Sequence, residues 1–324
     1  MRSPSVEVAV NLDSVRAAAE SLRQRTGVGL IAVIKADAYG LGAVRIADAL
    51  ASVVSEFAYF SVTEARVVGR PGLVLGPPDG APAEFRELRL RPAVTDRRTA
   101  QQFAGLPVAI KLDTGMQRFG CQPEDLDDLA RTCNVVDYFS HAVTLAATRC
   151  LRVACAGRGR PLHAAATCLL GEPEAWFDAV RPGLALYRGA VRVTTRLQTV
   201  RETKGPVGYT GFHHSPAGVL LVGYSNGLQA GPVVINGRRQ HLLEVGMNTS
   251  FVTVDPTDRP GDEVVLLGRE LAEPELAQHF GTREHEILCR YTAMGVRRYA
   301  TPGPQPTPDS LCTTRSTAPT PPRT

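Results

Sequence analysis

The 324-residue sequence has little lysine, four methionines, one tryptophan and no long apolar run. A membrane-spanning helix needs about 18–20 consecutive apolar residues, and no segment approaches that length. The first residues, MRSPSVEVAVNL, lack the charged and then apolar pattern of a signal peptide. We therefore expect a cytoplasmic protein without a membrane partner.

Concentrated charge of one sign is also missing. The formal net charge is only +4 and the basic residues are dispersed, whereas nucleic-acid-binding proteins gather basic side chains on one face. We therefore expect no nucleic-acid partner. The hydrophobic fraction of 44% is ordinary for a globular protein, and the length suits two domains or one barrel-sized domain with an appendage.

The seven cysteines show no disulfide or metal-ligand pattern. Their number is odd, and the sequence contains neither CxxC pairs nor Cys/His ligand spacing. Both features argue against a disulfide framework and against a zinc site. We expect reduced thiols and no bound metal.

Lysine is scarce enough to be informative. Of 36 basic residues only Lys35, Lys111 and Lys204 are lysine, and the other 33 are arginine. A lysine amine can lose its proton and act as a nucleophile, which a guanidinium does not do. The three lysines are therefore the first candidates for a functional role.

Strand-like and helix-like segments alternate from Val8 to Tyr187. The expected strands are Leu30–Ile34, Phe57–Val62, Leu73–Leu75, Pro92–Val94, Val108–Leu112, Val135–Phe139, Pro161–Ala164 and Leu184–Leu186. The expected helices include Asp13–Arg25 with Asp13 as N-cap, Val44–Ser52, Asp96–Phe103 and Pro123–Thr132. Eight such alternations predict an α/β fold, a (β/α)8 TIM-type barrel with its chemistry at the carboxyl ends of the strands. A doubly wound sheet is the structural alternative.

The remaining segments divide the chain further. Residues 142–160 show no clear helix, so we expect an irregular connection there. After Ala190 short strands with hairpin turns, including Asn236-Gly237, predict a smaller β domain. We expect the barrel domain at residues 1–188, the β domain at 189–301 and a disordered tail rich in Pro and Thr at 302–324.

Lys35 has the position that a barrel gives a reactive amine. The segment IAVIKADAYGLG places it at the end of an apolar strand, followed by small residues and Tyr39. A desolvated lysine with a lowered pKa can form a Schiff base. A strand-end lysine that only extends its amine into water is the alternative.

The same segment resembles the cofactor-lysine motif of the alanine racemase family. Blocks similar to that family follow in its order: FAYFSVTEA, LVLG, IKLDTGMQRFG, FSHA, VRPGLALY, PVGYTGF, VGYSNGL and GMNTSFVTVD. The resemblance covers nearly residues 6–299. It implies a barrel that binds pyridoxal 5′-phosphate through Lys35, and a homodimer in which the second subunit's β domain closes each active site.

The resemblance also implies roles for four side chains. Lys35 and Tyr209 would move protons on opposite faces of the substrate, with Tyr209 supplied by the partner chain. Arg181, in VRPG, would meet the pyridine nitrogen, and His141, in FSHA, would link Arg181 to the tyrosine. From the residues alone, Tyr209 could be a packed turn aromatic, Arg181 could pair with a carboxylate, and His141 could be a core or surface histidine.

Lys111 and Arg118 share the block KLDTGMQRFG. Two neighbouring cations at a buried strand end are costly. The resemblance implies that Lys111 is carbamylated, which makes it an anion that holds Arg118 toward cofactor and substrate. An ion pair between Lys111 and Asp113 or another carboxylate is the alternative.

The phosphate-binding groups match the family in part. The resemblance implies contacts from Tyr39, from the backbone of Gly183 and from Thr167, which stands where a serine is usual. Ala166 replaces the family's asparagine, and Met294 falls where its phosphate tyrosine is expected. Two cofactor contacts are therefore predicted to be lost.

The loop GMNT carries a further difference. Met247 keeps the family's residue at the substrate entrance, and Asn248 replaces an aspartate there. Losing that carboxylate changes the electric field that an amino-acid zwitterion meets. The implied activity is racemisation of alanine or a related small amino acid. A relative recruited to another reaction of the same cofactor, such as decarboxylation of an unusual amino acid, is the first alternative, and a catalytically silent cofactor-binding protein is the second.

Overall fold

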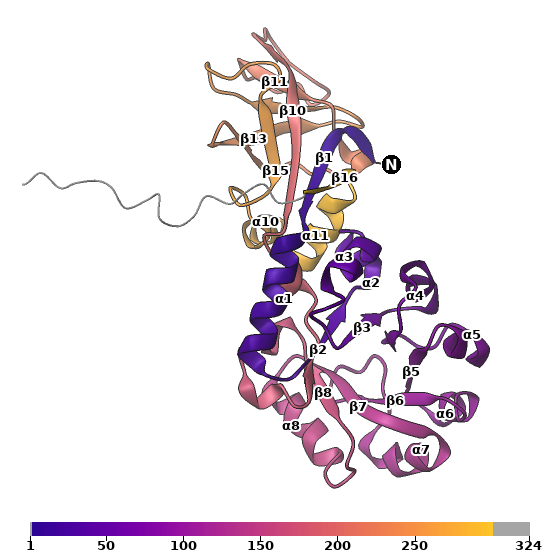
Figure 1. Ribbon diagram of the computed structural model, residues 1–324. Helices are drawn as coiled ribbons and strands as arrows, with labels where there is room; N and C mark the ends of the chain where they lie inside the picture. The colour runs from indigo at the N-terminus through magenta and orange to yellow at the C-terminus, as the bar shows by residue number, and fades with distance from the viewer. Residues whose placement is uncertain (1, 301–324) are drawn as a thin grey trace, which may run out of the picture.

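The computed structural model describes residues 2–300 and contains two sheets (Figure 1). One is a closed barrel of eight parallel strands, and the other is an eight-stranded, mostly antiparallel sheet that lies above the barrel in this view. The predicted barrel followed by a β domain is thereby confirmed. The predicted tail at 302–324 lies outside the described residues.

The barrel strands follow one another in chain order around the ring. They are β2 (Gly29–Val33), β3 (Glu56–Tyr59), β4 (Gly72–Val74), β5 (Leu90–Val94), β6 (Pro107–Leu112), β7 (Asn134–Ala142), β8 (Leu162–Ala165) and β9 (Ala179–Val180). Pairing of Gly29 with Ala179 closes the ring between β2 and β9. Small side chains such as Ala58, Ala93 and Ala109 surround Phe139 in the apolar layer inside the barrel.

Helices cover the outside of the barrel (Figure 1). They are α1 (Leu12–Thr26), α3 (Ala43–Leu50), α4 (Val62–Val68), α5 (Pro82–Glu87), α6 (Arg97–Gln102), α7 (Leu126–Thr132) and α8 (Leu145–Ala154). The prediction of Asp13 as the first N-cap is wrong. Asn11 caps α1, because its Oδ1 accepts the Ser14 N–H at 2.9 Å, which satisfies a backbone donor that the helix itself leaves free.

Two further sequence predictions are corrected. The segment Leu184–Leu186 is not the eighth strand but part of α9 (Leu184–Tyr187), and the eighth strand is the two-residue β9. A three-residue apolar run does not distinguish strand from helix, and two residues carry no periodicity. Residues 142–160 contain the regular helix α8, which Thr144 caps by accepting the Ala147 N–H at 3.2 Å.

The second sheet draws strands from both ends of the chain. Its order is β11 (Ala217–Leu220), β14 (Ser250–Thr253), β13 (Arg238–Val245), β12 (Pro232–Ile235), β15 (Glu263–Leu267), β10 (Val191–Arg201), β1 (Ser3–Asn11) and β16 (Gly295–Ala300). The predicted turn at Asn236-Gly237 joins β12 to β13, with both residues at positive φ. β1 pairs antiparallel with β10 and parallel with β16.

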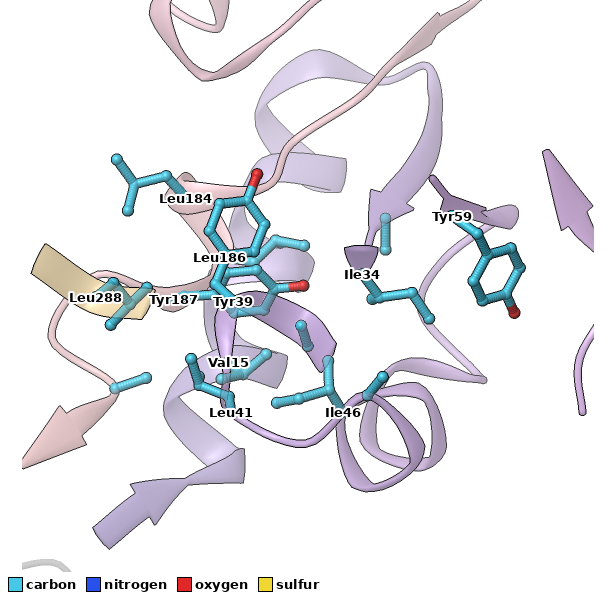
Figure 2. Close-up of a cluster of buried hydrophobic side chains, with 14 of the residues drawn as sticks. Val15, Ile34, Tyr39, Leu41, Ile46, Tyr59, Leu184, Leu186, Tyr187 and Leu288 are labelled. Carbon is cyan, nitrogen blue, oxygen red and sulfur yellow. The ribbon is translucent and has the colours of Figure 1, made fainter. Parts of the chain in front are cut away.

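Two helices with no counterpart in the sequence prediction lie where the sheet meets the barrel (Figure 1). They are α10 (Glu273–His279) and α11 (Glu284–Thr292). Leu288 of α11 packs in the buried cluster that contains Tyr39, Tyr187 and Leu184 (Figure 2). The residues after Lys35 are therefore held by both parts of the molecule.

A charged cluster fills the barrel interior at the amino ends of the strands. Arg91 Nη2 lies 2.6 Å from Glu56 Oε2 and 2.9 Å from Asp137 Oδ2. His163 Nε2 lies 3.3 Å from the same Asp137 oxygen, and its ring stacks on Phe139 at 5.1 Å. Burial lowers the pKa of His163 to about 4, so its imidazole is neutral at pH 7. Across residues 2–300, no helix is both long and apolar enough to cross a membrane.

We expect Arg91→Met to destabilise the fold strongly, because it leaves the buried Asp137 and the half-buried Glu56 carboxylates without their cation. The expected loss is about 3–5 kcal/mol of unfolding free energy, measured by urea denaturation. Arg16→Met is the matched control, since Arg16 pairs with Glu20 on the exposed face of α1 at 2.9 Å. Such a pair contributes about 0.3–0.5 kcal/mol. Equal effects of the two substitutions would contradict a structural role for the buried cluster.

Candidate active site

A cavity of about 1110 Å³ opens at the carboxyl ends of the barrel strands. Its walls include six residues that the sequence singled out: Lys35, Tyr39, His141, Thr167, Arg181 and Gly183. They come from four separate stretches of the barrel domain, and closure of the barrel brings them together. Arg118, Lys111, Tyr209 and Met247 do not line this cavity.

Lys35 begins a turn with unusual backbone geometry. The four residues from Ala36 to Tyr39 have φ between 52° and 57°, which is the left-handed region, although none of them is glycine. Each such residue costs about 1–2 kcal/mol. Strain of this kind persists only where surrounding contacts fix the conformation, and it concentrates at functional sites.

Several contacts fix this turn. Glu64 of α4 accepts the Ala36 N–H at 2.8 Å and the Phe60 N–H at 2.7 Å. Asp37 accepts the Ala43 N–H at 2.7 Å and pairs with Arg297 of β16. Glu64 stands in the block FAYFSVTEA, but its role was not visible from the sequence because it depends on the packing of α4 against the turn.

Tyr39 ends the turn and is buried. Its ring centroid lies 5.1 Å from that of Tyr187, and Figure 2 shows the two rings packed together. A Cβ added at Gly183 would lie 2.2 Å from the Tyr39 hydroxyl oxygen, so the cavity wall at this point admits only glycine. Burial raises the pKa of Tyr39 to about 12, which keeps the hydroxyl as a hydrogen-bond donor.

The cavity is rich in cations. Burial is the largest cause that lowers the pKa of Lys35, and the nearby Arg118 charge adds to it. Burial, followed by the charge of Arg181, also lowers the pKa of His141 to about 4. Both effects favour the neutral amine and the neutral imidazole. The positive charges of Arg118 and Arg181, which contribute to both lowered pKa values, favour an anionic ligand.

Arg181 is held rigidly beneath the cavity. Its Nη2 donates to the backbone carbonyls of Ser140 and, at 3.2 Å, of Ala164, and its Cζ lies 5.0 Å from the centre of the Phe139 ring. Its Nε is buried and has no hydrogen-bond partner among the described residues. It makes no ion pair with a described carboxylate, unlike the alternative weighed from the sequence. The unmatched donor fits a ligand with a hydrogen-bond acceptor.

Lys111 lies at the end of β6, next to this cluster. Burial is the main cause that lowers its pKa to about 8, and the charges of Arg181 and Arg118 contribute. Its Nζ donates to the Leu75 carbonyl at 3.3 Å. Asp113 instead accepts backbone N–H groups of its own loop, from Gly115 at 2.9 Å and Gln117 at 3.1 Å.

Of the positions that the family resemblance connected with phosphate binding, some line the cavity and one does not. Thr167 lines it, and its hydroxyl accepts the Ala185 N–H at 3.2 Å. Ala166 also lines it, so the loss of a longer side chain there leaves space. Met294 is fully buried in the hydrophobic core and does not reach the cavity.

Tyr209 and Met247 lie in loops of the second sheet and are 95% and 58% exposed. Glu244 fixes the Tyr209 loop by accepting the backbone N–H groups of Tyr209 at 3.1 Å and Thr210 at 2.6 Å. Asn248 Oδ1 accepts a hydrogen bond from the Ser225 hydroxyl at 2.8 Å. Within one chain these loops expose their aromatic and apolar groups to solvent.

Sequence reasoning missed three residues beside the cavity. His285 and Cys289 of α11 line it, and Phe139 supports Arg181 from below. His285 and Cys289 lie in no quoted motif, because α11 comes from the far end of the chain, and Phe139 stands in the block FSHA without having been given a role there. Among residues 2–300, no group of three His, Cys, Asp or Glu side chains could hold a metal ion.

Comparisons with known proteins agree with this geometry. Models of the alanine racemase N-terminal and C-terminal domains match residues 10–191 and 190–299. An alanine racemase of Pectobacterium atrosepticum is 31% identical, with 90% of this chain and 97% of that protein covered. One of Rhodospirillum rubrum is 30% identical, with 86% and 90% covered.

Solved structures have the same fold. The biosynthetic alanine racemase of Pseudomonas aeruginosa superposes with a TM-score of 0.83 at 27% identity, covering 92% of this chain and all of that one. An alanine racemase of Bartonella henselae, solved with covalently bound pyridoxal phosphate, gives 0.81 at 23% identity, with 92% of this chain and all of that one covered. The chain belongs to the alanine racemase family, whose members are pyridoxal-phosphate-dependent isomerases.

Proposed function

We propose that this chain interconverts L- and D-alanine, with Lys35 and Tyr209 as the two proton-transfer groups. The observation that carries the proposal is the single cavity in which Lys35, His141 and Arg181 meet. In that cavity the lysine has a lowered pKa and a buried arginine nitrogen has no partner. These are the groups that a pyridoxal phosphate enzyme needs for covalent attachment and for contact with the ring nitrogen.

The residues present fit pyridoxal 5′-phosphate. Lys35 would hold it covalently, Arg181 would face its ring nitrogen, and Tyr39, Thr167 and the Gly183 backbone would surround its phosphate. The bound cofactor acts as an electron sink that makes the Cα–H of an amino acid acidic. Because the Arg181 guanidinium keeps its proton, it would donate a hydrogen bond to the ring nitrogen without protonating it, which would favour racemisation over transamination.

Racemisation requires a proton acceptor and a proton donor on opposite faces of the substrate Cα. Lys35 Nζ, whose lowered pKa raises the fraction of neutral amine that can accept a proton, would serve one face. The Tyr209 hydroxyl would serve the other. His141, uncharged above pH 4, would position Tyr209 relative to Arg181.

The site would be completed by a second copy of the chain. Tyr209 is 95% exposed and does not line the cavity of its own chain. Met247, from another loop of the same sheet, is also exposed. A homodimer in which each β domain covers the partner's barrel would bury both residues and bring Tyr209 opposite Lys35, with Met247 at the substrate entrance.

Lys111 would act as an anion. Its neutral amine would attack carbon dioxide to form a carbamate with release of one proton, and the carbamate would orient the Arg118 guanidinium toward the substrate. The lowered pKa of about 8 supports this step, because it raises the fraction of neutral amine at physiological pH. The free thiols of Cys121, Cys133, Cys150, Cys155, Cys168 and Cys289 suit a cytoplasmic location.

The two alternatives are less well supported. The relatives that cover most of this chain are alanine racemases, which does not favour recruitment to another reaction. A silent binding protein would not need both proton-transfer groups or the lowered pKa values. A chiral assay with alanine and serine tests all three functions directly.

The first experiment locates the cofactor. Borohydride reduction of the purified enzyme, followed by peptide mapping, should place the pyridoxyl group on Lys35, because its buried amine is the nucleophile that lines the cavity. Lys204→Ala should leave the label unchanged. Labelling of Lys204, or no bound cofactor, would contradict the proposed site.

The second experiment tests whether Tyr209 transfers the proton on the face of the substrate opposite Lys35. Tyr209→Phe should lower racemisation about 10²- to 10⁴-fold in both directions, because one acid/base group is missing. In deuterated solvent the variant should still exchange the Cα hydrogen of one enantiomer through Lys35. NMR exchange and chiral chromatography measure the two rates. Unchanged racemisation by Tyr209→Phe would refute the assignment.

A mixture of two inactive variants tests whether the partner subunit supplies the tyrosine to each active site. Lys35→Ala and Tyr209→Phe are each expected to be nearly inactive. Subunit exchange should restore about a quarter of the parent activity, since half the dimers then contain one intact site of two. No recovery, with subunit exchange verified by mass spectrometry, would mean that Lys35 and Tyr209 act within one chain.

The third experiment tests the carbamate. Labelled ¹³C-bicarbonate should give a carbamate NMR signal in the parent that Lys111→Arg lacks, and Lys204→Arg should retain it. The signal should grow as pH rises through about 8, because only the neutral amine reacts. A parent enzyme without the signal at pH 9 would exclude the modification.

A further inference from the structure

The Tyr209 loop (residues 207–212) is a short turn within the connection from β10 to β11 of the second sheet (Figure 1). Its two ends pair as an isolated antiparallel bridge, in which the Val207 N–H donates to the Phe212 carbonyl at 2.9 Å. Tyr209 and Thr210 therefore stand at the tip of the turn.

The Tyr209 side chain does not anchor this loop. It is 95% exposed, and its hydroxyl has no hydrogen-bond partner among residues 2–300. The direction in which the ring leaves the sheet is therefore set by the backbone of the turn. A turn that must present one side chain in one direction needs contacts to its backbone, because each free residue samples many conformations.

Glu244 of β13 supplies those contacts. Its Oε1 accepts the Tyr209 N–H at 3.1 Å, and its Oε2 accepts the Thr210 N–H at 2.6 Å and the Thr210 hydroxyl at 2.7 Å. Hydrogen bonds from the Thr210 side chain and then from its backbone hold the pKa of Glu244 below its ordinary value, so the carboxylate is an anion at pH 7. Hydrogen bonds to an anion are stronger than those between neutral groups.

A β-bulge directs Glu244 toward the loop. Leu242 pairs with Val252 of β14, whereas Glu244 pairs with Phe251, so Leu243 is an extra residue on β13. A bulge re-aims the side chains that follow it. Glu244 is thereby buried, with 8% of its surface exposed, although it carries a charge.

Two residues of the loop fit it to the same hairpin. The Phe212 ring packs edge-on against the Phe251 ring, with centroids 5.3 Å apart. Gly208 has a φ of 69°, and a Cβ added there would lie 2.5 Å from Glu244 Oε1. The left-handed backbone and the close carboxylate both require glycine at this position.

We propose that Glu244 is a positioning residue for the proton transfer by Tyr209. Its carboxylate holds the tip of the turn in one conformation, so that the ring is already directed when it enters the site of the second copy. Fixed geometry of a reacting group is a large part of catalysis. This inference rests on the proposed function, because it concerns the tyrosine assigned there to one face of the substrate.

The first test measures each face of the substrate separately. Glu244→Ala should lower kcat for alanine racemisation about 10- to 100-fold, the usual effect of losing hydrogen bonds to a charged group, and leave KM within about threefold. In deuterated solvent, exchange of the Cα hydrogen on the Lys35 face should stay within about twofold of the parent. Glu263→Ala is the matched control. Glu263 pairs with Arg192 at 2.7 Å on the same sheet, and its loss should change none of these quantities by more than about twofold.

A double variant distinguishes positioning from a general structural effect. Glu244→Ala combined with Tyr209→Phe should racemise within about twofold of Tyr209→Phe alone, because Glu244 acts only through the Tyr209 hydroxyl. Two independent effects would instead multiply. Glu244→Gln, which keeps one acceptor oxygen, should recover part of the rate that Glu244→Ala loses.

Hydrogen exchange, followed by mass spectrometry on the full chain, tests the same contacts without turnover. Peptides that contain Tyr209 and Thr210 should exchange at least about tenfold faster in Glu244→Ala, because their N–H groups lose their acceptor. Peptides from β15 should be unchanged. Gly208→Ala, which keeps Glu244 but places a Cβ against its carboxylate, should also speed exchange in the loop.

The outcomes separate this inference from the proposed function. Unchanged racemisation in Glu244→Ala, equal losses on both faces, or losses that multiply in the double variant would overturn the role of Glu244 and leave Lys35 and Tyr209 assigned. Where Glu244→Ala does not fold, Glu244→Gln carries the same comparisons. A parent chain without racemase activity, or Tyr209→Phe as fast as the parent, would overturn the proposed function itself.

Discussion

The left-handed turn from Ala36 to Tyr39 is the constraint on which the site depends. Four residues with a Cβ adopt a conformation that costs about 1–2 kcal/mol each, and contacts from three other parts of the chain offset that cost. Glu64 supplies one contact from α4, Arg297 another from β16, and Thr292 of α11 donates to the Tyr39 carbonyl at 3.1 Å. The turn places Lys35 and Tyr39 at opposite ends of one short segment, so the same strained backbone positions two side chains of the cavity wall.

The second domain also supports the turn that follows Lys35 in the barrel domain of the same chain. The second sheet holds the turn through Arg297, and Tyr299 donates to the Leu41 carbonyl at 3.0 Å. Its strand β16 pairs with β1, the first strand of the chain, directly before α1 of the barrel. A substitution that shifts β16 would therefore also shift the backbone of the turn, and with it the position of Lys35.

The positive side chains clustered around Lys35 favour the binding of anions. The charges of Arg118 and Arg181 lower the pKa values of Lys35, Lys111 and His141, in addition to burial. Cations gathered in a partly desolvated place are unfavourable unless ligands compensate them. A phosphate, a substrate carboxylate and a carbamate on Lys111 are three anions that would do so. The stability of the folded site and the binding of its ligands are coupled for this reason.

The sequence by itself determined the fold class, the strand-end position of Lys35 and the hairpin turn at Asn236-Gly237, whereas the resemblance to the alanine racemase family pointed to Tyr39, His141 and Arg181. Strand alternation, strand-end positions and turn chemistry are local properties, and local pattern is enough to predict them. It failed where an element was too short or too weakly patterned, as at β9 and α8, and where capping depended on one side-chain contact, as at Asn11.

Only the tertiary structure decided the rest. The left-handed turn, the clamp from Glu64, the pairing of β1 with β10 and β16, and the approach of His285 to Tyr39 all join residues distant in the chain. Tertiary structure also placed Tyr209 outside the cavity that Lys35 lines in the same chain. Contacts of this kind have no periodicity in the sequence, because they arise when already formed elements pack and bury their surfaces against one another.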